Sequence, residues 1–405
     1  MQLKEKKKKR IGLIVGIIVS VLLIGSVAAF VILFPHNSNT SETVKTPEKP
    51  AALPTSVSSN TLFFGNMFWG RYMNDWATAS PLKTAYPFSR LGEFDRTKYD
   101  AWIAGLECPT VANFSQTSIQ EDTTLSFNCS PTYLPEASKW FTAVTLANNH
   151  TDNRGAEGFA ETKVHLDENK IQYFGHYDPD QLTDVCEVIT MPVKVTYNDG
   201  TTKEQGLPFA MCGYHGVFKI PSQESLAVME QYSQYMPVIA MPHMGVEYQP
   251  APDQLKTSTY QSMIDHGADM VIGDHPHWIQ NTEAYKGHLI VYSMGNFMFD
   301  QQDTAEVVRS AAINVKVDLK DADSAQLSKW LALADDCKKF HDDCLEKIKD
   351  ANLKKLDFTY QFGVVGTNDS GKITKPATAD QQASILQRLN WTNTMNKLQP
   401  PYSSL

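Results

Sequence analysis

The stretch that decides the fold is GADMVIGDHPHWIQNTEAYKGHLIVYSMGNFMFD, residues 267–300. Within it, Met270–Ile272 is a short apolar run rich in branched side chains, which is typical of a buried strand, and it stops at Gly273. A second apolar run, Leu289–Tyr292, also ends at once in small polar residues that begin with Ser293. Open α/β sheets keep their functional sites beyond the carboxyl ends of their strands, so these two ends are where we expect chemistry.

His275 and His277 follow the first of these runs and are separated by Pro276. Two histidines at this spacing can direct both imidazoles to one small volume beyond the strand, and the proline stiffens the connection. The alternative is that both are ordinary buried histidines whose rings are satisfied by hydrogen bonds. Metal ligation is a leading use of clustered imidazoles, so the pair favours a metal site.

Outward from this stretch, apolar runs of strand length alternate with stretches of helical spacing. The predicted strands cover residues 62–64, 101–106, 141–146, 171–174, 208–212 and 237–240, and the predicted helices cover residues 158–169 and 254–266. This alternation predicts a layered α/β domain, which we place at residues 61–310. Residues 311–405 continue with a strand at 311–319, a helical segment at 325–355 and a strand at 358–365, which complete or extend the domain.

Candidate ligands follow several of the other strands. Glu107, Asn149, His150 and His243 each come within a few residues of the end of an apolar run. Singly, each has an ordinary explanation as a cap, a turn residue or a packed ring. Their repetition at equivalent positions instead predicts a site for one or two divalent metal ions. A set of carboxylate, amide and imidazole donors suits ions such as Mn, Fe or Zn.

The N-terminus predicts a membrane anchor. Residues 1–10 carry a net charge of +5, and Ile11–Phe34 holds no charged side chain over a length sufficient to span a bilayer as a helix. A cleaved signal peptide is the competing interpretation, but the apolar core of such a peptide ends after about 7–15 residues. By the positive-inside rule the basic tail stays in the cytoplasm and the main domain lies outside the cell membrane. Residues 35–60, rich in Pro, Ser and Thr, are expected to form a disordered linker.

The composition limits the partners of the chain. Its 405 residues are 42% hydrophobic and 20% charged, which fits a globular protein with a large core. The formal net charge is −9, and without the +5 tail the remainder carries −14. An acidic body of this kind argues against nucleic acid as a partner.

Six cysteines lie in the part of the chain that we expect outside the membrane, where an even count permits three disulfides whose pairing stays open. Cys337 and Cys344 lie in a stretch of helical spacing, and seven residues of unbroken helix would separate their Cα atoms by about 10.5 Å. This pair could therefore bond only across a break in the helix. No CxxC pair is present, which disfavours a zinc site made of thiolates.

Six motifs together give the chain a family resemblance. They are FFGNMFWGR (63–71), GLECP (105–109), LANNHTDNRGAEGFAET (146–162), PHMGVEY (242–248), GADMVIGDHPHWIQ (267–280) and VYSMGNFMFD (291–300). In these motifs the chain resembles the CapA-type capsule synthesis proteins, the poly-γ-glutamate-associated branch of the calcineurin-like metallophosphoesterase superfamily. The ANNH, HPH and SxGNFxFD blocks are specific as a set, and anchoring in a membrane agrees with that family.

The resemblance implies a sandwich of two β-sheets flanked by helices, with a two-metal site at the strand ends. By position, Glu107 would bridge the two metals. Asn149, His243 and His275 would complete one metal site, and His277 would serve the other.

The resemblance also implies roles in catalysis and exposes two departures from the family pattern that matter, with a smaller third one at Gly105. His150 would be the acid near the leaving group, and Arg71 would face an anionic group of the substrate. Asn66 stands at a metal-ligand position where the family usually has Asp, so a neutral carbonyl replaces a carboxylate and should weaken that metal. Asn153 also stands where Asp is usual, and Gly105 stands where Asn is common.

Three functions follow as expectations from these motifs. The first is a metal-dependent hydrolase or transferase that acts on an anionic polymer beside other membrane components of a polymer synthase. The second is a non-catalytic component that binds the polymer or an assembly partner, and Asn66 motivates it. The third is a general extracytoplasmic phosphodiesterase, which rests on fold relatives alone.

Overall fold

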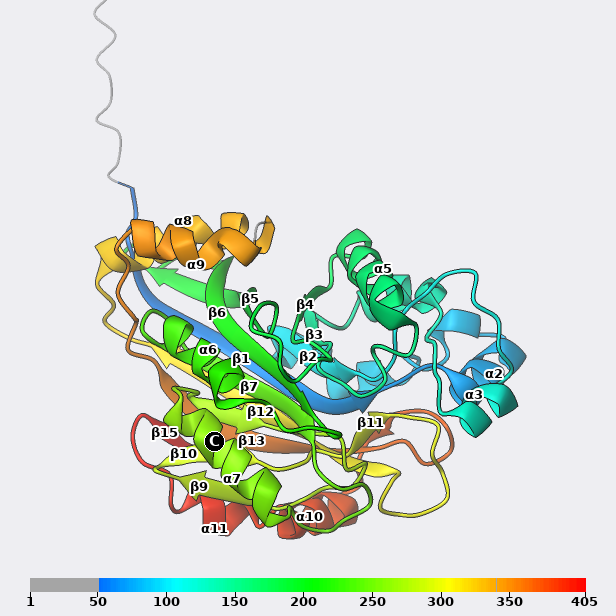
Figure 1. The fold of residues 1–405 in the computed structure, drawn as a ribbon. Coiled ribbons are helices and arrows are strands. Elements are labelled where there is room, and N and C mark those ends of the chain that lie inside the picture. The colour runs from blue at the N-terminus through cyan, green and yellow to red at the C-terminus, as the bar shows by residue number, and fades with distance from the viewer. Residues whose placement is uncertain (1–50, 340) are drawn as a thin grey trace, which may run out of the picture. The chain divides into compact units, whose positions relative to one another are not determined.

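The strand β1 (Pro54–Met67) connects a long and a short branch of one β-sheet. The computed structural model describes residues 51–339 and 341–405, and Ala52–Leu405 form one unit. The N-terminal part of β1 pairs antiparallel with β12 (Arg309–Leu319) and with β5 (Cys186–Tyr197). Its C-terminal part pairs parallel with β2 (Ala101–Leu106) and with β11 (Asn296–Met298), as Figure 1 lets the reader follow.

In the described part of the chain the strands make one 15-stranded mixed network. The long branch has the order β14-β13-β12-β1-β5-β6-β7-β8-β10-β9, and the short branch leads from β1 through β2 and β3 to β4. The remaining strands are β3 (Ala143–Thr145), β4 (Gln172–Phe174), β6 (Thr202–Gly216), β7 (Val238–Met244), β8 (Met270–Ile272), β9 (Thr282–Tyr285), β10 (His288–Val291), β13 (Thr359–Asn368), β14 (Lys375–Pro376) and β15 (Tyr402–Ser404).

The two sheets that the resemblance implies are not separate in the structure, because they share the strand β1. A strand of 14 residues is long enough to pair with β5 near its start and with β2 near its end, so β1 joins both branches. The coarser prediction, a mixed α/β sheet flanked by helices, is confirmed.

Successive residues of the short branch face two different hydrophobic clusters. Phe63 and Ile103 point into the larger cluster, which also holds the apolar residues of β5 to β8. Leu62, Phe64 and Trp102 point the opposite way into a smaller, aromatic-rich cluster. This alternation follows from the two-residue period of a strand, and it buries both faces of the short branch.

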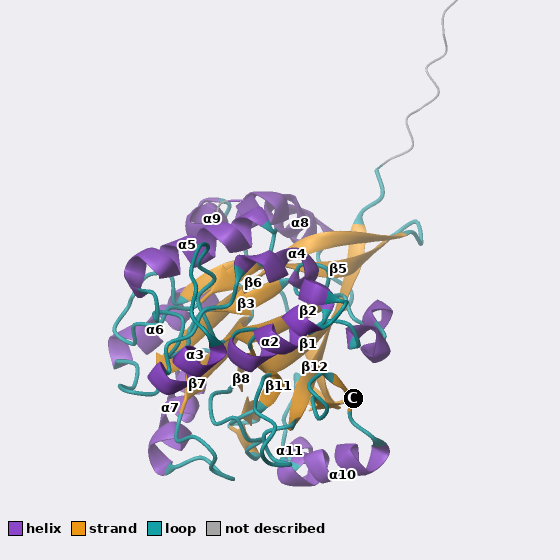
Figure 2. Ribbon diagram, turned by 90° about the vertical axis from the view of Figure 1, so that its right-hand side faces the viewer, coloured by secondary structure: helices purple, strands orange, loops and turns teal. Residues whose placement is uncertain are grey.

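Helices cover the outer faces of the sheet, as the purple ribbons around the orange strands in Figure 2 make clear. α6 (Gln223–Ser233) and α7 (Gln254–Asp265) contact β6, β7 and β8, while α8 (Ser324–Lys339) and α9 (His341–Asp350) contact β5. The other helices are α2 (Arg71–Ala79), α3 (Ser118–Thr124), α4 (Leu134–Ala137), α5 (Gly155–Glu168), α10 (Ala379–Arg388) and α11 (Trp391–Met395), with the 3₁₀ turns η1 (Lys83–Ala85), η2 (Leu91–Phe94), η3 (Arg96–Lys98) and η4 (Pro131–Tyr133).

The predicted domain boundary at residue 61 is wrong, because residues 54–60 already belong to β1. This part of the chain is polar in sequence, but Val57 and Ser59 are buried and the backbone is paired on both sides. The basic tail, the predicted span at residues 11–34 and the linker up to residue 50 lie outside the described residues. Among the helices that the structure does describe, none combines the length and the apolar character needed to cross a bilayer.

All six cysteines are paired. Cys108 bonds Cys129, Cys186 bonds Cys212 across the β5–β6 ladder, and Cys337 bonds Cys344. The last pair spans the interval between α8 and α9, so its Cα atoms are 4.8 Å apart and the predicted condition of a helix break is met.

Candidate functional site

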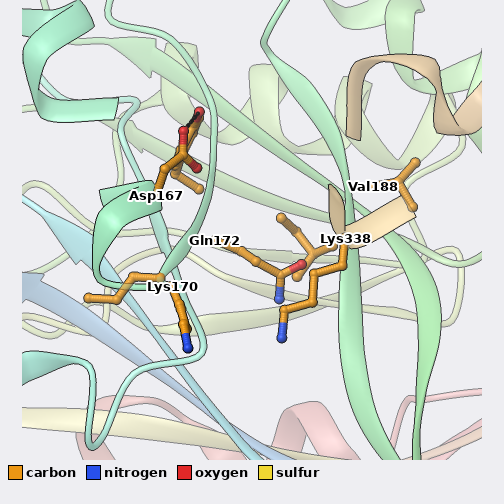
Figure 3. Close-up of a pocket in the computed structure, with 8 residues that line it drawn as sticks. Asp167, Lys170, Gln172, Val188 and Lys338 are labelled. Carbon is orange, nitrogen blue, oxygen red and sulfur yellow. Dashed lines mark hydrogen bonds between the residues drawn. The ribbon is translucent and has the colours of Figure 1, made fainter. Parts of the chain in front are cut away.

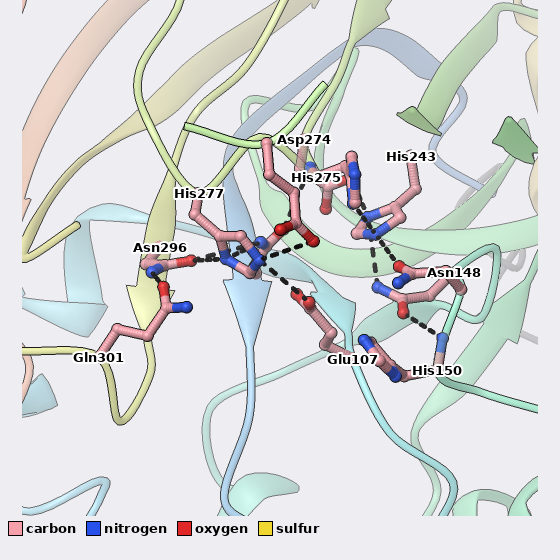
Figure 4. A network of polar contacts seen from close by, with 12 residues as sticks. Glu107, Asn148, His150, His243, Asp274, His275, His277, Asn296 and Gln301 are labelled. Atoms are coloured by element: carbon pink, nitrogen blue, oxygen red, sulfur yellow. Dashed lines mark hydrogen bonds and ion pairs between the residues drawn. The ribbon is translucent and has the colours of Figure 1, made fainter. Parts of the chain in front are cut away.

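Five of the predicted site residues meet where the ends of β2, β3, β7 and β8 come together. β7 and β8 are parallel neighbours, and a bridge between His243 and Asp274 continues their pairing into the site. In Figure 4 the side chains of Glu107, His243, His275 and His277 gather in one place from these separate strands. The carboxyl ends of parallel strands share one edge of a sheet, which is why residues far apart in sequence meet here.

The closest group of donor atoms comprises Asn149, His243 and His275. The Nε2 atom of His243 lies 2.8 Å from the Oδ1 atom of Asn149 and 3.1 Å from the Nδ1 atom of His275. The Nδ1 atom of His243 lies 2.7 Å from Asp274 Oδ1, and an N–H donated there leaves a lone pair on Nε2. Adjacent ligands of an ion bound at about 2.1 Å are about 3 Å apart, so these spacings fit a coordination shell.

A second, looser group surrounds His277. Its Nε2 atom lies 3.8 Å from Glu107 Oε1 and 3.9 Å from Glu247 Oε1. Its Nδ1 atom lies 2.8 Å from Asn296 Oδ1, and donation to that oxygen leaves the Nε2 lone pair facing the carboxylates. The ring of Tyr248 stacks on the imidazole with centroids 5.4 Å apart and fixes its plane.

The backbone at the histidine pair is strained. His275 has a backbone φ of 90° and His277 has a backbone φ of 61°, values that residues other than glycine rarely adopt. Such residues cost about 1–3 kcal/mol each and cluster at functional sites. The surrounding structure therefore holds both rings in place against a local preference.

Two buried carboxylate oxygens in this place have no hydrogen-bond partner, Oε2 of Glu107 and Oδ2 of Asp274. Burial, with Asp274 nearby as the second cause, raises the pKa of Glu107 well above its usual range. Burial also raises the pKa of Asp274 to about 8. Carboxylates of this kind need a cation or a proton, so the donor set fits a divalent ion.

Within residues 51–339 and 341–405, however, no three His, Cys, Asp or Glu side chains already stand in the arrangement of a metal site. One reason is visible in the geometry. The tight group contains two histidines and an amide, and the spacings of the looser group at His277 are wider than those of atoms that share one ion.

Asn66 was predicted as a metal ligand, but its amide is committed elsewhere. Its Oδ1 atom accepts the backbone N–H of His275 at 3.3 Å. Its Nδ2 atom points to His277 Nδ1 at 3.2 Å and to Asn296 Oδ1 at 3.3 Å. Asn66 therefore stabilises the loop that carries His275 and His277. Its amide N–H group, rather than a lone pair, points toward His277.

Arg71 was predicted to face an anionic group of the substrate, and that role stays a prediction. Its Nε and Nη2 atoms donate to both oxygens of Asp300 at 2.9 and 2.6 Å, and Nη1 pairs with Asp122 at 3.1 Å. The guanidinium also lies 4.6 Å from the centroid of the Phe127 ring. The fork of Arg71 is thus occupied by carboxylates of its own chain.

His150 lies at the rim of the site, and its Nδ1 atom is 3.0 Å from Asn153 Oδ1. Because an amide oxygen can only accept, Nδ1 carries the proton and Nε2 carries the lone pair. Burial lowers the pKa of His150 to about 4. In this state Nε2 is the atom that can take up a proton, and the role as the acid near the leaving group stays a prediction.

Three residues that the sequence analysis did not assign belong to the site. Asp274 and Asn296 orient His243 and His277 respectively. His215 lies beside His243 in the β6–β7 ladder, is buried, and has an Nε2 atom without a partner. Its place at the end of a strand was the signal that could have found it.

A hollow of about 160 Å³ lies apart from this cluster, next to α5, β4 and β5. Figure 3 shows Asp167, Lys170, Gln172 and Lys338 along its walls. None of the predicted ligands lines it, so it belongs to a different part of the molecule from the strand-end site.

The sequence matches the family described as "Bacterial capsule synthesis protein PGA_cap" over residues 60–301, and the chain belongs to this family. The capsule biosynthesis protein CapA of Bacillus anthracis is 31% identical over 173 residues, which are 40% of this chain and 41% of that protein. The PGA biosynthesis protein CapA of Bacillus subtilis (strain 168) is 26% identical over 178 residues, 40% of this chain and 43% of that protein. The chain thus spans about two fifths of the length of these relatives.

Two solved structures are similar at a lower level. A phosphatase from Mycoplasma pneumoniae has a TM-score of 0.33 and 12% identity, covering 65% of this chain and 88% of that one. The protein TT1561 of Thermus thermophilus has a TM-score of 0.34 and 12% identity, covering 63% of this chain and 93% of that one. Neither similarity is close enough to assign chemistry to this chain.

Proposed function

We propose that this protein is a membrane-anchored, outward-facing component of capsule or poly-γ-glutamate-type polymer synthesis that acts as a metal-dependent hydrolase or transferase. The observation that carries the proposal is the convergence of Asn149 Oδ1, His243 Nε2 and His275 Nδ1 at the ends of three strands. Family membership supports the link to polymer synthesis, because the two Bacillus relatives are named for capsule and PGA biosynthesis.

The residues divide the work of holding the metal. Asn149, His243 and His275 would hold one divalent ion, and His277 with Glu107 would hold a second. The chemistry supplied by a divalent ion held there would be polarisation of a phosphoryl or amide oxygen and a lower pKa of bound water. Glu107 would supply negative charge beside His277, and its Oε2 atom has no hydrogen-bond partner of its own.

His150 would carry a proton at the rim of the site. Asn153 fixes the proton on Nδ1, so Nε2 is the atom that exchanges a proton with the substrate or with water. Glu247, which lies 3.9 Å from His277 and is partly exposed, would face the same opening.

The location and partners form part of the proposal. Ile11–Phe34 would anchor the chain in the cell membrane with residues 1–10 in the cytoplasm. The domain would then meet an anionic polymer and other membrane components of a polymer synthase on the outer side. Its acidic composition supports a role for bound cations when an anionic polymer approaches.

Metal analysis of the full chain tests the proposal. The double variant His275→Ala/His277→Ala should lose bound Mn, Fe or Zn relative to the wild type, because it removes one ligand from each group. His266→Ala/His288→Ala is the matched control, since both of these rings lie away from the donor atoms and bond other residues. Equal metal content in all three proteins would refute the proposal.

A second function is favoured by Asn66, whose amide is bonded to the histidine loop. In this case the protein would hold the polymer or an assembly partner without catalysis. Asn66→Asp should then create hydrolysis of γ-glutamyl or phosphodiester substrates that the wild type lacks. Turnover of either substrate by the wild type would exclude this function.

A further inference from the structure

Asp274 is a buried carboxylate with one oxygen bonded and one oxygen without a partner. It directly follows Gly273 at the end of β8, and its backbone N–H donates to Pro242 O at 3.1 Å. Oδ1 lies 2.7 Å from His243 Nδ1, whereas Oδ2 is buried and contacts no donor. A buried charge without a partner is costly, so the free oxygen calls for a cation.

The direction of the free oxygen is set by Gly105 on β2. A Cβ atom at Gly105 would lie 2.3 Å from Asp274 Oδ2, so only glycine leaves room for the carboxylate there. Gly105 lies in β2, and Glu107 follows directly after Leu106, the last residue of that strand. The free oxygens of Asp274 and Glu107 are both buried just beyond the ends of β8 and β2, and the negative charge of Asp274 acts on Glu107.

Asn66 lies opposite Gly105 in the register of β1 and β2. It cannot supply negative charge, and its carbonyl already accepts the N–H of His275. The carboxylates that remain at the ends of these strands are Glu107 and Asp274.

We propose that Asp274 of this chain is a metal ligand. Its Oδ2 atom occupies the space that Gly105 leaves open and supplies the negatively charged oxygen that the neutral amide of Asn66 does not provide. The inference rests on the proposed metal-dependent function and deepens it. Asp274 would join the two donor groups, because one of its oxygens orients His243 while the other lies against Gly105 on the strand that leads to Glu107.

The rival explanation is that Asp274 only orients His243 and that Lys256 balances its charge. Lys256 is fully buried and its charge is felt at Asp274. Its Nζ atom, however, donates to Gln280 Oε1 at 3.1 Å, and the Oδ2 atom of Asp274 has no donor. Lys256 therefore makes no hydrogen bond to the free oxygen of Asp274, which is left for an ion.

Binding of Mn²⁺ and of Zn²⁺ to the full chain tests the inference by calorimetry and by metal content after gel filtration. Asp274→Asn keeps an oxygen for His243 Nδ1–H and removes the charge, so metal affinity should fall about 10- to 100-fold. Asn66→Asp in the Asp274→Asn background returns a carboxylate to the same region and should recover most of the loss. Asp369→Asn is the matched control, because it is an equally buried aspartate outside the site.

Each remaining outcome decides between the hypotheses. Unchanged affinity in Asp274→Asn, with loss in His243→Ala, would overturn the ligand role and leave the metal-dependent function intact. A loss in Asp274→Asn that Asn66→Asp does not recover would reduce Asp274 to a positioning residue and also overturn it. Absence of binding by the wild type would refute the proposed function itself. Near-ultraviolet circular dichroism of each variant establishes that it is folded.

Discussion

Arg71 and Asp300 form a bidentate ion pair between the start of α2 and the end of the SMGNFMFD motif, with N–O distances of 2.9 and 2.6 Å. The Asp300 carboxylate is almost fully buried, and it also accepts the backbone N–H of Tyr72 at 3.2 Å. The pair thus ties α2 to the segment that carries Asn296, and through it to His277. The motifs FFGNMFWGR and VYSMGNFMFD are therefore held together by this ion pair, which we call the Arg71–Asp300 clamp.

The first prediction concerns this clamp. Asp300→Asn removes the negative charge and one of the two oxygens that accept from the buried Arg71 guanidinium, so the free energy of unfolding should fall by about 3–5 kcal/mol. Urea denaturation measures the change. Glu93→Gln, which breaks the exposed pair with Arg90, should change stability by less than about 1 kcal/mol. Equal effects of the two substitutions would contradict a clamp.

The second prediction concerns Asn296, which accepts a hydrogen bond from His277 Nδ1. Asn296→Ala frees the imidazole to rotate, so metal affinity should fall about 10- to 100-fold even though no ligand is removed. Gln301→Ala is the control, because Gln301 bonds the other end of the Asn296 amide and not the histidine. Calorimetry with Mn²⁺ distinguishes the two, and identical affinities would argue against orientation by Asn296.

The third prediction concerns Lys256, whose pKa burial lowers from 10.5 to about 7. Between these values the unfolded chain binds more protons than the folded chain, so this residue makes stability rise with pH. Lys256→Met should therefore flatten the rise in unfolding free energy between pH 8.5 and 10. Lys139→Met, at an exposed position, should leave the slope as it is in the wild type. A wild-type slope in Lys256→Met would show that the ammonium is not desolvated.

The fourth prediction concerns the Cys108–Cys129 disulfide, which closes a loop of 21 residues beside Glu107. Replacing both cysteines with serine should lower stability by about 3 kcal/mol through the larger entropy of the unfolded chain. The Cys337–Cys344 pair closes a loop of only 7 residues, and its removal should cost about 2 kcal/mol. A larger loss for the shorter loop would rule out this entropic origin.

The convergence of polar side chains could be predicted from the sequence where these residues follow apolar runs. Glu107, His243 and His275 were found this way, because a buried strand is visible as a local run and the parallel arrangement brings the strand ends together. The helix predicted at 254–266 was also correct to within a residue, since Asp253 caps its N-terminus.

Features that depend on pairing between distant segments could not be predicted. Residues 54–60 are polar, and only the neighbours β5 and β12 make them a strand. The free oxygen of Asp274 depends on a glycine in another strand, and no local pattern connects the two. The ion pair of Arg71 with Asp300 could not be predicted either, because an arginine can bind a substrate anion as well as a carboxylate of its own chain.

The long reach of β1 has a consequence for synthesis of the chain. The ribosome completes β1 at Met67, but its partner β12 begins only at Arg309. At about 5–20 residues per second, the nascent chain carries this bare edge for roughly ten to fifty seconds. A fragment that stops before Arg309 would keep the edge permanently open to other chains and is expected to aggregate.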